Sequence, residues 1–280
     1  MANVLSVIDE IDALACSNRL DDVLLKAREI QNSHGQNFAE SLIAAGLRAP
    51  DVLIAGPART ASTWLRGVLS KHPNISVAIG EPNILFNISR GNIHSTLSWY
   101  AKHDIWRGNP KNNAKYCDKS PSYIRLPDRD IAILGALFPN IKIIFGYRDE
   151  TERLWSALHH RMNDFKFKKD WRSFCSQYPH EALHHIDAGK INFHAERWKR
   201  YFNKNNILIL PYLAITTSPY FCVNTAIHHI DVCNISQMPS NERSRIEDRI
   251  NTREAKKSIG TPPNNFISEI QSIINDTILH

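Results

Sequence analysis

Residues Asp51–Trp64, DVLIAGPARTASTW, join an apolar run to a Gly-Pro turn and a row of hydroxyl side chains. The apolar run predicts a buried strand, because a short run that a glycine closes is typical of one. From Ser62 onward apolar residues recur at helical spacing, so a helix is expected to begin there. A helix N-terminus offers free N–H groups and the positive end of its dipole to an anion. The segment therefore predicts a phosphate or sulfate site with these side chains at it: Arg59, Thr60, Ser62 and Thr63.

The loop differs from the phosphate loop of ATP- and GTP-binding proteins, G-x-x-x-x-G-K-[ST]. It starts with Gly56 but has Ala61 in place of the second glycine, and no lysine precedes its hydroxyls. The lysine that would reach a γ-phosphate is missing, which disfavours ordinary nucleoside-triphosphate chemistry. The alternative is a plain strand–helix connection in which a serine or threonine only caps the helix.

Length and composition are those of a soluble globular protein. The 280 residues suffice for one large α/β domain or two small ones, and 42% hydrophobic and 22% charged residues are ordinary values. The net charge of +6 suits an anionic small molecule as well as a nucleic acid. Because the basic residues form only short clusters, without an aromatic RNA-binding signature, we expect no nucleic-acid partner.

The cysteines and the first residues indicate the compartment. No two of the five cysteines have C-x-x-C spacing, so we expect neither a zinc site nor a disulfide framework, and a reducing cytosol fits best. The start, MANVLSVIDEIDAL, has acidic but no basic residues, unlike a signal peptide. No apolar run approaches the length of a membrane span. We therefore expect a cytoplasmic protein with no metal and no membrane partner; the oligomeric state is not indicated.

The rest of the chain predicts a parallel sheet flanked by helices. Residues 1–49 are expected to form an N-terminal helical extension packed on the core, and residues 50–280 an α/β domain. Alternating strand and helix patterns of this length are typical of a parallel sheet. The expected strands are Val52–Ala55, Ile75–Ala78, Lys115–Asp118, Ile141–Tyr147 and Ile207–Leu210. The expected helices between and after them are Ser62–Ser70, Asp130–Leu137, Thr151–Met162, Phe193–Phe202 and Pro219–Ile230.

Charged or hydroxyl side chains follow four of the expected strands. Ligands bind at the carboxyl ends of the strands in such sheets, so these loops should face one crevice. Arg59 follows the first strand, Glu81 the second, and Arg148 the fourth, while Lys119 stands at the end of the third.

In their order and spacing these segments resemble the sulfotransferases that use 3′-phosphoadenosine 5′-phosphosulfate (PAPS). ARTAST matches their first loop, R/K-x-G-[ST]-T, except for Ala61, and DKSPSY is close to E-K-[ST]-P-x-Y of the carbohydrate-modifying branch. IIFGYRDETERLWS has an Arg and a Ser at the family's eight-residue spacing, and FHAERWKRYFNKNNILIL resembles the segment that follows. The resemblance spans residues 50–262.

The resemblance implies a P-loop-kinase-like fold and transfer of a sulfuryl group from PAPS to a hydroxyl, or a nitrogen, of a small-molecule or carbohydrate acceptor, with 3′-phosphoadenosine 5′-phosphate (PAP) as product. Glu81 would be the general base, and Lys119 and Arg59 would offset charge on the leaving phosphate. The resemblance also implies the residues that bind the donor: Arg59, Thr60, Ala61, Ser62, Thr63 and Trp64 at the phosphosulfate, Arg148 and Ser156 at the 3′-phosphate, and Lys257 in a late basic loop.

Other interpretations stay open at this point. Glu81 could be a structural partner of Arg59 or Lys119, and Arg148 could pair with Asp149 or Glu152. A P-loop small-molecule kinase is one alternative function. A non-catalytic nucleotide-binding regulator is another, since Ala61 resists a positive φ. Acceptor recognition is expected in the segment that holds Trp99, Tyr100 and Trp106, and His159 or His160 could reach the acceptor.

Overall fold

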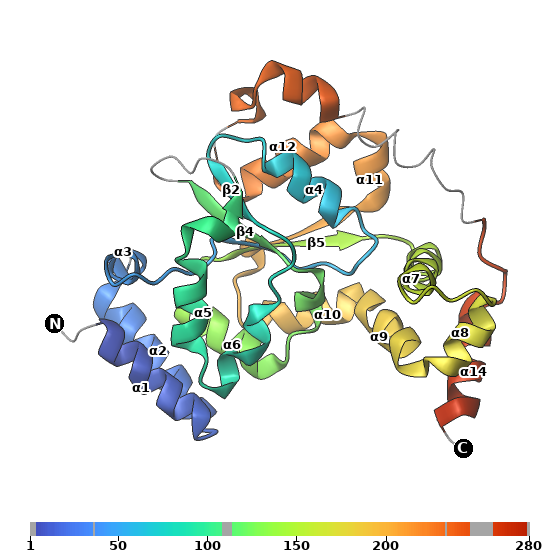
Figure 1. Ribbon diagram of the computed structural model, residues 1–280. Helices are drawn as coiled ribbons and strands as arrows, with labels where there is room; N and C mark the ends of the chain where they lie inside the picture. The colour runs from blue at the N-terminus through green and yellow to red at the C-terminus, as the bar shows by residue number, and fades with distance from the viewer. Residues whose placement is uncertain (1–3, 36, 108–113, 233, 247–259, 279–280) are drawn as a thin grey trace.

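A six-stranded sheet forms the centre of the molecule (Figure 1). The computed structural model describes residues 4–35, 37–107, 114–232, 234–246 and 260–278. The strand order is β3-β2-β4-β1-β5-β6, and all neighbouring pairs are parallel except β2 and β3. The strands are β1 Val52–Ile54, β2 Ile75–Ala78, β3 Trp106–Arg107, β4 Lys115–Lys119, β5 Lys142–Tyr147 and β6 Ile207–Pro211.

The central strand, β1, lies between β4 and β5 and is buried on both faces, which explains its unbroken apolar sequence. Leu53 points into one apolar layer with Phe145 and Trp198, and Ile54 into the other layer with Trp64. Helices α4, α11 and α12 cover the second layer, at the top of Figure 1, and α5, α6 and α10 cover the first. Their bounds are α4 Ser62–Leu69, α5 Ile93–Tyr100, α6 Asp128–Leu137, α10 Ile191–Lys199, α11 Tyr212–Thr217 and α12 Pro219–His229.

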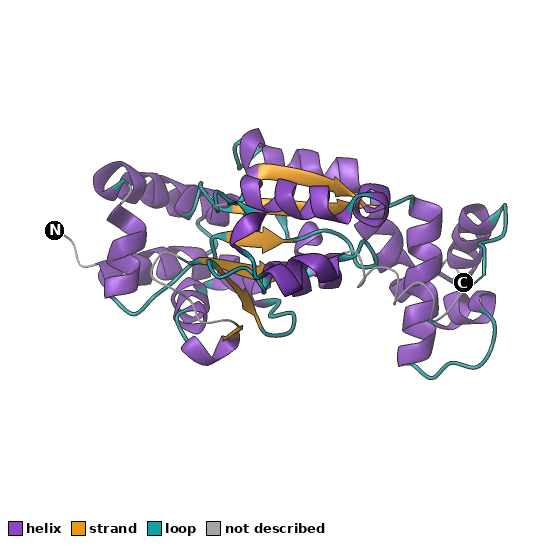
Figure 2. Cartoon of the chain, turned by 90° about the horizontal axis from the view of Figure 1, so that it is seen from above, coloured by secondary structure: helices purple, strands orange, loops and turns teal. Residues whose placement is uncertain are grey.

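Helical groups flank the sheet at its two ends, so that the molecule is elongated in Figure 2. The N-terminal group packs through α2 on α6 and through α1 on α5. The C-terminal group has its own apolar cluster around Trp155, Phe174 and Phe266, beyond the carboxyl ends of the strands. These groups consist of α1 Val4–Cys16, α2 Leu20–His34 and α3 Asn37–Ala44, and of α7 Glu150–Asp164, α8 Trp171–Gln177, α9 Pro179–Gly189 and α14 Phe266–Ile278.

Short 3₁₀ helices, labelled η, connect several of these elements. Two of them, η1 and η3, matter for the site because each is the next element after β2 or β4. The short helices are η1 Ile84–Arg90, η2 His103–Ile105, η3 Pro121–Arg125, η4 Lys204–Asn206 and η5 Ile235–Gln237. None of the helices in the described part of the chain has the length and apolar character needed to cross a bilayer.

The predicted α/β fold with a mostly parallel sheet is confirmed. Each of the five predicted strands is present with ends that differ by at most one residue. The antiparallel strand β3 was missed because its two residues are too few for a strand pattern. Helices α5, α8, α9, α11 and α14 were missed as well, and α9 turns out to form part of the candidate site.

Candidate active site

The loop after β1 packs closely against the end of β5. A Cβ on Gly56 would lie 2.3 Å from the Gly146 nitrogen, and one on Gly146 would lie 2.3 Å from Thr60 Oγ1. Only glycines therefore allow this approach. Thr60 is buried, and its hydroxyl donates a 2.7 Å hydrogen bond to the Pro57 carbonyl, so it stabilises the loop from within. The expectation that this hydroxyl faces a ligand is wrong.

Left-handed backbone at two non-glycine residues shapes the same loop. Arg59 has φ 74°, and Ala61, the N-cap of α4, has φ 64° and ψ 18°. Ala61 thus adopts the conformation that a glycine would take there. No side chain caps the first turn of α4, which leaves its N–H groups directed out of the helix start. Ser62 lies beside this turn and lines the neighbouring cleft.

Lys119 connects the loop to the residue predicted as general base. Its Nζ donates to Thr63 Oγ1 at 3.1 Å and also to the Glu81 carboxylate. The Lys119 side chain is 3% exposed, and that of Glu81 is 47% exposed. Burial lowers the pKa of the Lys119 ammonium, although the contact with Glu81 acts in the opposite direction. Lys119 therefore releases a proton more readily than an exposed lysine would.

Arg148 and Ser156 both contact Arg59. Arg59 Nε donates to Ser156 Oγ at 3.0 Å, and Arg148 Nη1 lies 3.5 Å from the Arg59 carbonyl oxygen. The Arg148 guanidinium also pairs with Glu152 at 3.3 Å and lies 4.3 Å from the centre of the Tyr212 ring. The eight-residue spacing thus brings both side chains to the first loop, and the alternative pair of Arg148 with Glu152 is present at the same time.

A cleft of about 380 Å³ opens beside Arg59, Glu81 and Lys119. Two helices form its far wall, and each presents residues at positions i, i+3, i+4 and i+7, which share one face of a helix. Arg125 of η3 completes the wall. The helical residues are Ala157, His160, Arg161 and Asp164 on α7 and Glu181, His184, His185 and Ala188 on α9.

Ion pairs hold charged residues of this wall in place, one within the wall and one to Asp187 of α9 behind it. Arg161 pairs with Glu181 at 2.9 Å, and Arg125 pairs with Asp187 at 3.3 Å. His185 is buried, and burial together with the neighbouring cations lowers its pKa to about 3, so its ring is neutral. The wall therefore offers both hydrogen-bond donors and hydrogen-bond acceptors, and ion pairs already hold them in place.

The structure corrects several other expectations. The Trp64 side chain is buried in the apolar layer around α4, so only its backbone is near the loop. Tyr100 and Trp106 are also buried, and neither lines the cleft. Of the two histidines, His160 lines the cleft. His159 hydrogen bonds to the Trp155 carbonyl instead. Lys257 lies outside the described residues.

Apart from His160, sequence reasoning missed the far wall. The notable residues are Arg161 and Glu181, each of which shares an i, i+3, i+4, i+7 spacing with two other polar residues and an alanine in the sequence. That pattern gives the shared face of a helix but not the surface that it faces. The position of these helix faces opposite Lys119 follows only from the packing of α7 against α9.

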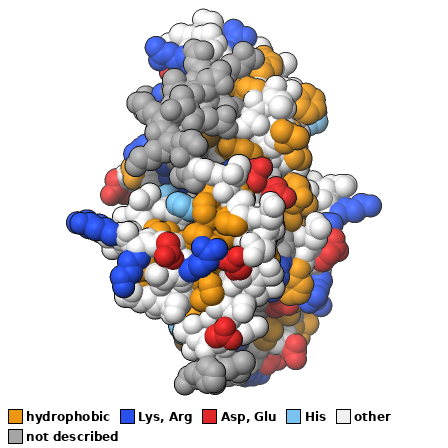
Figure 3. Space-filling view, turned by 90° about the vertical axis from the view of Figure 1, so that its right-hand side faces the viewer, with side chains coloured by type: hydrophobic (Ala, Val, Ile, Leu, Met, Phe, Trp, Pro, Cys, Tyr) orange, Lys and Arg blue, Asp and Glu red, His pale blue; other side chains and the backbone are white. Residues whose placement is uncertain are grey.

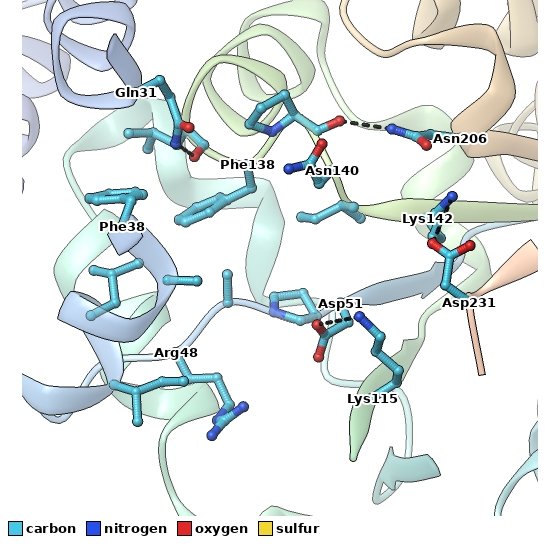
Figure 4. A pocket seen from close by; sticks show the side chains of 18 of the residues that line it. Gln31, Phe38, Arg48, Asp51, Lys115, Phe138, Asn140, Lys142, Asn206 and Asp231 are labelled. Atoms are coloured by element: carbon cyan, nitrogen blue, oxygen red, sulfur yellow. Dashed lines mark hydrogen bonds and ion pairs between the residues drawn. The ribbon is translucent and has the colours of Figure 1, made fainter. Parts of the chain in front are cut away.

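A second hollow, of about 330 Å³, lies at the opposite edge of the sheet (Figure 4). The charged residues at the strand starts are paired there, Asp51 with Lys115 at 3.6 Å and Lys142 with Asp231 at 3.1 Å. Phe38 and Phe138 stack on its other side. This hollow lies between the N-terminal helices and the sheet, away from the loop after β1.

The side of the molecule at the right of Figure 1 is shown in Figure 3. On the part drawn in colour, Lys and Arg side chains are interspersed with Asp and Glu. Hydrophobic side chains lie between them, so the visible part of this face has no single sign of charge. Among the described residues, no three His, Cys, Asp or Glu side chains are grouped so that they could hold a metal ion.

A comparison with models of known protein families assigns this chain to one of them. The model of the sulfotransferase domain matches residues 49–258, three quarters of the chain. The chain belongs to the sulfotransferase domain family. The resemblance inferred from the motifs is thereby confirmed, and the loop, Glu81 and Lys119 all lie within the matched sulfotransferase domain.

Individual relatives of this sulfotransferase domain are distant. The bifunctional heparan sulfate N-deacetylase/N-sulfotransferase 1 of Xenopus laevis is 28% identical over 203 residues, which cover 67% of this chain and 23% of that protein. The membrane-associated sulfotransferase kil1 of Dictyostelium discoideum is 28% identical over 152 residues, 54% of this chain and 31% of that protein. The chain thus spans about a quarter to a third of the length of these relatives.

A solved structure shares the fold. The sulfotransferase from Alicyclobacillus acidocaldarius superimposes with a TM-score of 0.55 at 14% identity, covering 82% of this chain and 97% of that one. At this identity the likeness shows a common fold and nothing finer. The P-loop-like architecture that the motifs predicted is confirmed.

Proposed function

We propose that this chain transfers a sulfuryl group from PAPS to a hydroxyl, or a nitrogen, of a carbohydrate or other polar small molecule. One observation carries the proposal: Lys119 contacts both Thr63 of the anion-binding loop and the carboxylate of Glu81. A cation, an anion cradle and a base are the groups that sulfuryl transfer needs. They meet at the mouth of one cleft.

The residues around the first loop fit the anionic donor. The backbone N–H groups at the start of α4 and the hydroxyls of Ser62 and Thr63 suit the phosphosulfate. Arg148 and Ser156, which both contact Arg59, suit the 3′-phosphate that distinguishes PAPS from ATP. Arg is well matched to phosphate because its planar guanidinium binds two oxygens at once.

Glu81 and Lys119 divide the proton transfers between them. Glu81 accepts the proton of the acceptor hydroxyl as the acceptor oxygen forms its bond to sulfur. The bond between sulfur and the phosphate oxygen breaks, and PAP leaves. Lys119 stabilises the charge on that oxygen and, because burial lowers its pKa, is the better proton donor. Arg59 keeps its charge at every working pH and acts only electrostatically.

The far wall favours a polar acceptor. Among the described residues that line the cleft, none has a phenyl, phenol or indole ring, and most are charged or hydrogen-bonding. An apolar phenol or sterol would leave these groups without partners, which is unfavourable. A polyhydroxylated acceptor can satisfy them. The relative whose printed name refers to heparan sulfate supports a carbohydrate among such acceptors.

The test is release of PAP from PAPS by the full chain in the presence of a panel of mono- and oligosaccharides. A thermal-shift comparison of PAP, ATP and GTP accompanies it. Stabilisation by PAP together with acceptor-dependent PAP release supports the proposal. Preference for ATP, with activity that a chelator abolishes and Mg²⁺ restores, would favour a small-molecule kinase. Binding of PAP without turnover of PAPS under any acceptor would favour a nucleotide-binding regulator.

A further inference from the structure

A buried carboxylate lies directly behind the site, on the residue before Lys119. Adjacent residues of a strand point to opposite faces, so Lys119 faces the first loop while Asp118 points into the apolar layer on the other side of the sheet. Asp118 is fully buried and accepts three hydroxyl hydrogen bonds. The donors are Tyr100 at 2.6 Å, Ser120 at 2.8 Å and Tyr123 at 3.0 Å.

Two of these three hydroxyls also hold the loop that carries Glu81. Ser120 Oγ accepts the N–H of Asn83 at 3.2 Å, and the Tyr123 hydroxyl lies 3.4 Å from the Leu85 nitrogen. Asn83 in turn donates from Nδ2 to the Glu81 carbonyl at 3.0 Å. Each hydroxyl has a single proton, which it gives to Asp118, and its oxygen is then free to accept from the loop.

A further contact closes the arrangement. The Ser122 hydroxyl hydrogen bonds to Asn83 Oδ1, and Asn83 has a left-handed φ of 56°. Asparagine tolerates this conformation better than most residues. Its backbone therefore forms the turn while its side chain makes hydrogen bonds that hold it. Asn83 in the turn after β2 and Leu85 at the start of η1 are thereby attached to the segment after β4 at three points.

We propose that Asp118 acts through Ser120 and Tyr123 to position the Glu81 loop, so that DKSPSY sets the place of the base as well as supplying Lys119. The carboxylate fixes the direction in which both hydroxyls donate, and this leaves their lone pairs directed at Asn83 and Leu85. Asp118, Ser120 and Tyr123 are positioning residues: Ser120 and Tyr123 contact the loop, Asp118 holds these two hydroxyls, and the reacting groups are contacted by other residues. The inference rests on the proposed role of Glu81.

The chain contains a matched control. Tyr100 and Tyr123 both donate to Asp118 Oδ2. Among the described residues of the loop, 81–85, only two contact this network: Asn83 through Ser120, and Leu85 through Tyr123. Tyr100→Phe therefore removes one hydrogen bond from the carboxylate without touching the loop. Tyr123→Phe and Ser120→Ala remove a bond to the carboxylate together with a bond to the loop.

The experiment compares Ser120→Ala, Tyr123→Phe and Tyr100→Phe in the full chain by two readouts. The first is amide hydrogen exchange over residues 79–86, which needs no activity. We expect faster exchange in Ser120→Ala and Tyr123→Phe and parental exchange in Tyr100→Phe. The second is PAP release, in which kcat should fall roughly tenfold to a hundredfold in the first two variants, with the KM for PAPS unchanged. Tyr100→Phe should keep the parental kcat.

Parental exchange and kcat in Ser120→Ala would overturn the inference, and so would an equal loss in Tyr100→Phe. A parent chain that releases no PAP with any acceptor contradicts the proposed function instead. In that case faster exchange in Ser120→Ala still supports the attachment of the loop, and unchanged exchange overturns it.

Discussion

Lys119 and Glu81 form an ion pair in which one side chain is 3% exposed and the other 47% exposed. The lysine reaches the site from inside the sheet, and the carboxylate reaches it from a surface turn. This asymmetry suits different tasks. The buried cation stays in place beside the loop, and the exposed carboxylate remains accessible to an acceptor that enters the cleft.

Glu81→Gln tests the role of the carboxylate. The change keeps the volume and the hydrogen bond to Lys119 but removes the proton acceptor. We expect kcat to fall by roughly two to four powers of ten, the usual scale for a lost general base. Affinity for PAP, measured by calorimetry, should stay close to that of the parent, because the base acts on the acceptor and not on the donor.

Two outcomes would speak against this role of Glu81. Turnover like that of the parent would remove it from the mechanism. Unfolding or loss of PAP binding would favour the purely structural interpretation of its pair with Lys119. Asp164→Asn is a matched control, because Asp164 lines the same cleft without contacting Lys119. It should leave PAP affinity unchanged.

Arg148→Ala tests recognition of the 3′-phosphate. We expect affinity for PAP to fall far more than affinity for adenosine 5′-phosphate, which lacks the 3′ group. The measurement is calorimetric titration of both ligands. Glu152→Gln removes the ion pair at 3.3 Å but keeps the guanidinium, so it should retain or improve PAP binding. Equal losses for both ligands in Arg148→Ala would show that Arg148 does not bind the 3′-phosphate.

Local sequence predicted the strand side of the site well. The apolar runs give the strands, and a parallel sheet brings their carboxyl ends together, so Arg59, Glu81, Lys119 and Arg148 were expected at one crevice. The structure places Arg59, Glu81 and Lys119 on one cleft, while Arg148 contacts the Arg59 carbonyl oxygen without lining that cleft. Their nearness also depends on the strand order, which the chain pattern does not fix, since β4 lies between β2 and β1 in the sheet.

The far wall and the interior of the loop could not be predicted in the same way. Whether Thr60 faces a ligand or the Pro57 carbonyl depends on backbone angles within a few residues. Whether α9 faces the cleft depends on its packing against α7, from which α8 separates it in the chain. Tyr100 looked like an acceptor contact from its place between two strands, yet it donates to the buried Asp118.

Ala61→Gly tests the strain in the loop. A non-glycine residue in the left-handed region carries a penalty of about 1–2 kcal/mol, and glycine carries almost none. The greater freedom of glycine in the unfolded chain offsets part of this gain, by roughly 0.4–1 kcal/mol. We therefore expect the free energy of unfolding to rise by up to about 1.5 kcal/mol, measured by urea denaturation.

At an ordinary helical position, an alanine-to-glycine substitution should change the free energy of unfolding in the opposite direction. Ala13 is an exposed residue of α1, and Ala13→Gly should lower the free energy of unfolding by about 1 kcal/mol. If both variants lose stability equally, the left-handed conformation of Ala61 is not under strain. PAP affinity should be kept in both, since neither change removes a polar group.

Asp118→Asn tests the buried carboxylate through the pH dependence of stability. Burial, only partly offset by the three hydroxyl donors, raises the Asp118 pKa from 3.8 to about 6. Between these values the folded chain binds more protons at this site than the unfolded chain, so this group lowers stability as pH rises from about 4 to 6 and has no further effect above that. The asparagine variant lacks this contribution. Its free energy of unfolding relative to the parent should therefore increase by up to about 3 kcal/mol across the window, as measured by urea denaturation at each pH.

Using the difference between two chains cancels the titration of every other group that the substitution leaves alone. A difference that stays constant from pH 4 to pH 7 would mean that Asp118 titrates alike in the folded and the unfolded chain, and that the three hydroxyls fully replace the water it loses.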